Sequence, residues 1–175
     1  MSRISRAAMV GATTALQAMD IKQKEQLADE IFHAQPNLLG SVLVLPRLGV
    51  TLAKVEFAVE ILFVCFLAMK ESGLSWPLIS EDEQDRQQQR FTAISRFGQE
   101  LGGGLQERSM QQYIAEHPEK ELLAHVMGET SKWLARIAPE DSDKYLMLAI
   151  WNLVNCIAFV ALAGSKTKAR RGQAS

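Results

Sequence analysis

The chain lacks a charge bias and is poor in cysteine. Its 19 Lys and Arg residues nearly balance 20 Asp and Glu residues, so the formal net charge is −1 over 175 residues. No global field therefore attracts the chain to nucleic acid or to acidic lipid. The two cysteines, Cys65 and Cys156, lie inside apolar stretches, where free thiols are usually buried. This pattern predicts two reduced core thiols rather than a disulfide, and it indicates a reducing, cytoplasmic compartment.

Strand signals and catalytic motifs are also nearly absent. Residues 41–45 form the one strand-like stretch, and a single short strand would have no partner. The three glycines at 102–104 follow no strand and precede no Lys-Ser/Thr pair, so they do not form a phosphate loop. No Ser/His/Asp or Cys/His arrangement of a nucleophile with its base can be identified. We therefore expect no catalytic residues, no cofactor and no enzymatic activity.

The most informative segment that is present is the uncharged run at residues 145–163. As a helix it would be about 28 Å long, which is close to the roughly 30 Å hydrocarbon thickness of a bilayer. Asn152 and Asn155 lie in its middle, and buried amides need partners that the neighbouring helices of a bundle supply. We therefore expect a core helix. Membrane docking through residues 145–163 is the alternative, and the basic residues of 166–175 would suit it.

Helix signals recur along the rest of the chain. Asp20 is expected to cap one helix, Pro36 suits the first position of the next, and Ser80 with Glu83 forms a capping-box pattern. The sequence predicts an all-α, single-domain bundle of about seven helices over residues 1–165, followed by a basic flexible tail at 166–175. Two very apolar helices, at residues 51–71 and 139–163, are expected to form its centre.

Five acidic and histidine residues could be assembled into a metal site. Glu30 and His33 form one Glu-x-x-His step of the kind that di-iron bundles use twice, but the second step is missing. Glu60, His125 and Glu129 could complete the ligand set. Each of the five is more simply a solvated residue on a helix face, and Glu60 is expected to stay wet beside Glu56 at the end of a polar stripe. We expect no bound metal.

Residues 38–60 resemble a degenerate helix-turn-helix. Gly49 suits the turn, and Val55 would pack inward. Pro46 interrupts the first helix, however, and Glu56 and Glu60 on the second would repel phosphates. A DNA-binding regulator therefore remains an alternative, although binding to nucleic acid is not expected.

A non-catalytic adaptor or regulatory domain that binds another protein is the function that the sequence favours. The apolar segment 38–50 is too long to bury in one short helix, and exposed aliphatic and aromatic surface is typical of interfaces. The partner is a protein of unknown identity or a second copy of the chain. Asn152 and Asn155 share one helix face, which is expected to meet residues 57–69 or a second copy. The candidate interaction residues are Trp76, Trp133, Trp151, Asn152 and Asn155.

Overall fold

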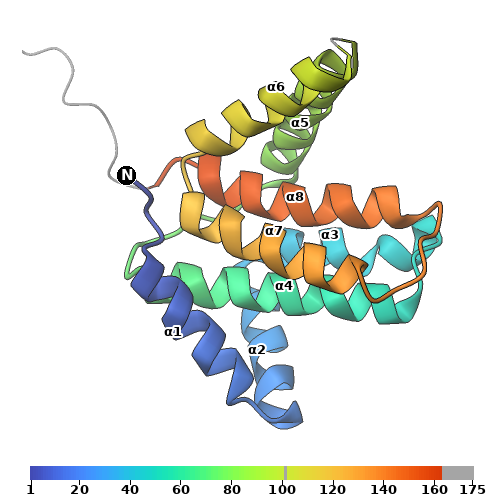
Figure 1. The fold of residues 1–175 in the computed structure, drawn as a ribbon. Helices are drawn as coiled ribbons and strands as arrows, with labels where there is room; N and C mark the ends of the chain where they lie inside the picture. Colours follow the sequence, from blue (N-terminus) through green and yellow to red (C-terminus); the bar gives the residue numbers. More distant parts are fainter. Residues whose placement is uncertain (101, 163–175) are drawn as a thin grey trace, which may run out of the picture.

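The computed structural model describes residues 1–100 and 102–162, and every regular element in these residues is helical (Figure 1). The elements are α1 (Arg6–Gln17), α2 (Ile21–Ala34), α3 (Pro36–Leu43), the 3₁₀ helix η1 (Leu45–Leu48), α4 (Leu52–Glu71), α5 (Glu81–Glu100), α6 (Gly103–Glu116), α7 (Lys120–Leu134) and α8 (Asp143–Phe159). The expected all-α bundle is confirmed. The tail at 166–175 lies outside the described residues.

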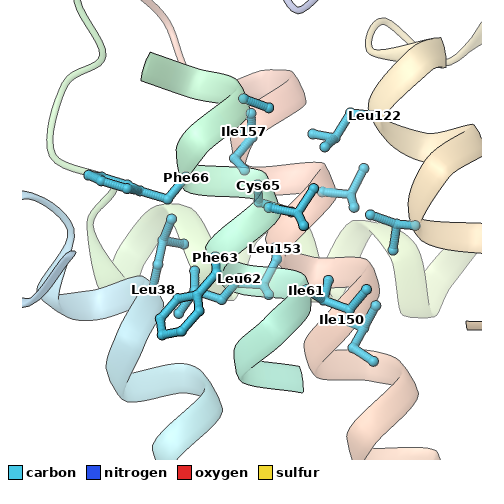
Figure 2. Packing of buried hydrophobic residues seen from close by; sticks show 14 of the residues in the cluster. Leu38, Ile61, Leu62, Phe63, Cys65, Phe66, Leu122, Ile150, Leu153 and Ile157 are labelled. Atoms are coloured by element: carbon cyan, nitrogen blue, oxygen red, sulfur yellow. The ribbon is translucent and has the colours of Figure 1, made fainter. Parts of the chain in front are cut away.

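The core is built around α4 and α8. Every residue of α4 from Ile61 to Met69 is buried, so this half of the helix is covered on all sides, as its uniformly apolar sequence requires. On α8, Ile150, Leu153 and Ile157 lie beside α4 (Figure 2). The expected central pair is therefore confirmed, and α8 contributes buried residues to the core from Leu146 to Ala158. No helix in the described residues is both long enough and apolar enough to span a membrane.

Several helix ends follow from local sequence. The Asp20 carboxylate accepts a hydrogen bond from the Gln23 backbone N–H at 2.8 Å, and the Gln23 side chain accepts one from the Asp20 N–H at 2.9 Å. Pro36 occupies the first turn of α3. Gly49 has a φ of 86°, so it takes the left-handed conformation that ends η1. Each of these features acts within a few residues, which is why the sequence predicts it.

The last helix begins later than expected. α8 starts at Asp143 rather than at residue 139. The Asp143 carboxylate accepts hydrogen bonds from the Glu140 N–H at 2.9 Å and from the Lys54 ammonium at 2.5 Å. Lys54 Nζ also lies 2.6 Å from the Glu140 carboxylate. These contacts hold the segment before α8 as a turn against α4, so the helix begins only after it.

The N-terminal segment, just before α1, is hydrogen-bonded to Glu119 at the start of α7. Arg3 Nε lies 2.9 Å from Glu119 Oε1, and the Ile4 N–H donates to Glu119 Oε2 at 3.0 Å. Glu119 is completely buried. The Arg3 guanidinium also donates to backbone carbonyls at the end of α8, including that of Val160 at 2.8 Å. From this shared end α1 and α7 run in different directions (Figure 1). The two helices therefore diverge over the surface of α4.

Candidate binding groove

A groove opens where α1 and α7 diverge over α4. Its volume is about 520 Å³, which lies within the range of ligand and peptide sites. Phe57, Ile61 and Val64 contribute from α4, and their spacing places them on one helix face. The opposite walls come from α1 and α7, with Lys24 of α2 at the rim. The remaining lining residues are Thr13, Leu16, Gln17, Met19, Glu60, His125, Glu129, Lys132, Trp133 and Arg136.

An aromatic pair marks one side of the groove. The rings of Phe57 and Trp133 are stacked, with centroids 4.3 Å apart and planes inclined by 7°. Both rings also line a second hollow of about 540 Å³ beside the start of α4, where Leu52 and Val55 contribute apolar surface. The pair is therefore shared by two adjoining hollows. It offers partly buried aromatic surface, which is the kind most often found at the centre of protein interfaces.

The charged side chains of the groove are mostly paired with one another. Lys24 Nζ lies 2.8 Å from Glu60 Oε1, and Lys132 Nζ lies 3.0 Å from Glu129 Oε1. The Glu60 side chain is 44% exposed, so it stays in contact with water as the sequence predicts. Arg136 is exposed and makes no ion pair with any residue in the described part of the chain. The groove therefore carries one cation without an internal partner.

His125 is the only histidine that lines the groove. Burial lowers its pKa, against the influence of Glu129 and with the support of Lys132. Its imidazole is therefore neutral at pH 7. The two neighbouring carboxylates, Glu60 and Glu129, are paired with Lys24 and Lys132.

The five metal candidates are divided between two places. Glu60, His125 and Glu129 do line the same groove. Glu30 instead pairs with Lys70 at 2.6 Å, and His33 Nδ1 lies 2.7 Å from the Asp29 carbonyl oxygen. Within residues 1–100 and 102–162, no group of three or more His, Cys, Asp or Glu residues is placed to hold a metal ion.

Of the three candidate tryptophans, only Trp133 lines the groove. Trp76 donates from Nε1 to the Met69 carbonyl at 3.0 Å, and the Arg3 guanidinium lies 4.9 Å from the centre of its ring. Trp151 stacks on Phe91 of α5, with ring centroids 5.4 Å apart. These two side chains are engaged in contacts within the bundle and are partly buried there.

The two asparagines of α8 are bonded across helix contacts, but the expected partner helix is wrong. Asn155 is 2% exposed, and its Oδ1 accepts from the Tyr113 hydroxyl and lies 3.3 Å from His117 Nε2, both on the α6 side. Asn152 donates from Nδ2 to the Gln84 carbonyl of α5 at 3.1 Å. The face of α8 that meets α4 is aliphatic, so the polar face turns towards α5 and α6. Asn155 on this face is buried inside the bundle, whereas Trp151 and Asn152 are partly exposed.

In the helix-turn-helix candidate, Lys54, which is the cation best placed to contact DNA, is not accessible. α3 has only 8 residues, and η1 separates it from the Gly49 turn. Lys54, the cation nearest the start of α4, is buried. Burial opposes its charge, but hydrogen bonds to Asp143 and Glu140 outweigh burial and raise its pKa. Its ammonium therefore serves the turn before α8.

Sequence reasoning missed Arg136 and, among the exposed aliphatic residues near η1, Leu52. Arg136 lies in the turn after α7, where its backbone N–H donates to the Trp133 carbonyl at 3.0 Å, and its closeness to Trp133 in the chain was the one sequence signal for it. Leu43, Val44, Leu48 and Leu52 are between 40% and 72% exposed and lie within ten consecutive residues. The apolar run 38–50 did indicate this surface.

No known protein family, curated protein or solved structure matches the chain.

Proposed function

We propose that this protein is a non-catalytic adaptor or regulatory domain that binds another protein through the groove between α1, α4 and α7. The observation that carries the proposal is the stacked Phe57–Trp133 pair, which is shared by two adjoining hollows of about 520 and 540 Å³. Tryptophan is enriched among the residues that contribute most to binding energy, especially where neighbouring side chains exclude water. A partner side chain on each side of the pair would bury it fully.

Exposed aliphatic surface next to the groove supports the same function. Leu52 lines the second hollow and is 72% exposed. Leu43, Val44 and Leu48, which precede Leu52 in the chain, are between 40% and 55% exposed. Single exposed apolar residues are common, but four within ten consecutive residues are a local concentration of exposed apolar side chains, which favours an interaction site in this region.

The state of the two thiols supports a reducing, cytoplasmic location for this function. Cys65 and Cys156 are free and buried. Burial raises the pKa of each thiol to about 12, and Glu83 adds to the effect at Cys156. Such thiols are unreactive at neutral pH, so they serve as packing groups rather than as nucleophiles.

The experiment is an affinity capture of the full chain from its native cells, repeated with three variants. Trp133→Ala removes the shared ring, and Leu52→Glu places a charge in the second hollow. Ile21→Glu is the matched control, because Ile21 is 79% exposed, is the first residue of its helix as Leu52 is, and lies outside both hollows. A captured protein is then purified and its affinity for each variant is measured.

We expect Trp133→Ala to weaken binding of the purified partner by about thirtyfold or more, because loss of a central interface tryptophan typically costs about 2 kcal/mol or more. Leu52→Glu should also weaken binding, and Ile21→Glu should not. Equal affinity of all three variants and the wild type would show that the groove is not the binding surface. Sedimentation of the purified chain, alone and as Trp133→Ala, determines whether the partner is a second copy.

A further inference from the structure

The shape of the groove suits a helix better than an extended segment. An extended peptide gains much of its affinity by adding to an exposed sheet edge. The described residues contain no strand, so such an edge is not offered there. The walls are formed by two diverging helices, and the contributing residues of α4 recur at helical spacing (Figure 1). A stripe of side chains from a further helix would fill this space by the same packing that joins α4 to α8.

The apolar side chains of the groove indicate which side chains a partner helix would present to it. Leu16 and Ile61 are buried beneath it, and the Phe57–Trp133 pair lies at its side. Aliphatic or aromatic side chains spaced three, four and seven residues apart on a partner helix would meet these groups. Thr13 and Gln17 on the α1 wall are uncharged, so this side of the groove favours neither acidic nor basic residues of the partner.

The charged residues of the groove determine which charge is favoured on the side of the partner helix that faces α7. Three cations and two carboxylates line the groove, and each carboxylate is paired with a lysine. Arg136 is the remaining cation, and it lies in the turn after α7, where its backbone N–H donates to the Trp133 carbonyl at 3.0 Å. A guanidinium binds a carboxylate through two parallel hydrogen bonds, which gives geometric as well as charge selectivity. An acidic residue one helical turn from the apolar anchor of the partner would reach Arg136.

We infer that the occupant of the groove is an amphipathic α-helix of another protein, with an apolar stripe that meets the Phe57–Trp133 pair and an Asp or Glu one turn away that pairs with Arg136. The inference rests on the proposed function and specifies the chemistry of the partner.

The test is a selection from a displayed library of 18-residue helical peptides, with the stripe and both flanks randomised, against the immobilised full chain. We expect enriched peptides to carry aliphatic or aromatic anchors at helical spacing and Asp or Glu three or four residues from an anchor. Their affinity should fall about tenfold or more for Arg136→Glu, because charge reversal replaces an attraction with a repulsion. Lys120→Glu is the control, since Lys120 is an exposed cation at the other end of α7 and lies outside the groove. It should leave affinity unchanged.

Several results would overturn the inference. Enriched peptides that depend on Trp133 but are extended, have basic flanks or ignore Arg136 would refute the helix or its charge, while leaving protein binding through the groove intact. Failure to enrich any peptide would refute an autonomous helical ligand. Binding to phosphatidylserine vesicles or to duplex DNA that is lost in Arg136→Glu, without peptide binding, would assign the cation to another class of partner. Failure of the proposed function itself is recognised separately, by capture that is indifferent to Trp133→Ala.

Discussion

Replacing Asn155 with Ala removes one oxygen that serves two donors. Tyr113 donates its hydroxyl hydrogen to Asn155 Oδ1. His117 Nδ1 accepts from the Glu119 backbone N–H at 3.2 Å, so the proton of the neutral ring is on Nε2, which faces the same oxygen at 3.3 Å. The variant therefore leaves two donors without an acceptor at the contact between α6 and α8.

The size of the effect follows from the burial of those two donors. A buried donor left without a partner costs about 1–3 kcal/mol. His117 is 2% exposed, whereas Tyr113 is partly exposed and can turn its hydroxyl outward. We therefore expect Asn155→Ala to lower the free energy of unfolding by about 2–4 kcal/mol in total.

Asn152→Ala is the matched comparison on the same helix. Asn152 donates one hydrogen bond to the Gln84 carbonyl, but its Oδ1 is buried without a partner among the described residues. Removing the amide loses one bond and also removes an unsatisfied acceptor, so we expect a cost of at most about 1 kcal/mol. Gln88→Ala, at an exposed position, should stay within about 0.5 kcal/mol of the wild type.

Urea unfolding followed by circular dichroism measures all three variants. With a slope of about 2 kcal/mol/M, Asn155→Ala should lower the midpoint by roughly 1–2 M at unchanged slope. The reasoning is refuted if Asn155→Ala unfolds at the same midpoint as Asn152→Ala, because the Asn155 oxygen would then not be the buried acceptor that joins α6 to α8.

Three further predictions concern pH, the N-terminal contact and a turn. Burial lowers the pKa of His117 and of His125, so the unfolded chain binds more protons and stability should fall as the pH drops below about 6.5. The Tm should be lower at pH 5.5 than at pH 7.5, and a smaller difference in the double Gln variant would identify these histidines as the cause. Glu119→Gln removes a completely buried charge that pairs with an arginine, and it should cost about 2–4 kcal/mol in a denaturant melt; wild-type stability would contradict this. Gly49→Ala should cost about 1–2 kcal/mol because of its positive φ, whereas Gly40→Ala, inside a helix with open space at its Cβ, should stabilise the fold; equal effects on Tm would argue against the left-handed turn.

Part of the candidate site could be predicted from the sequence. Trp133, which the sequence predicts as an interaction residue, lines the groove. Glu60, His125 and Glu129, which the sequence places in one candidate ligand set, line the same groove. Their expected chemistry changed because Lys24 and Lys132 pair with the two carboxylates. Lys132 follows Glu129 by three residues, so that pair could be anticipated. The pairing of Lys24 with Glu60 joins two helices and has no local signal.

The sequence by itself determined the helices, many of their ends and the central position of α4 and α8. These features depend on capping groups, proline, glycine and apolar periodicity, which act within one segment. Tertiary structure alone decided that the Asn152 and Asn155 face meets α5 and α6, and that Arg3 pairs with Glu119 across 116 positions of the chain. It also decided that α1 diverges from α7 and opens a groove. Contacts between distant segments depend on how whole helix surfaces fit together, and no local pattern in the chain records that fit.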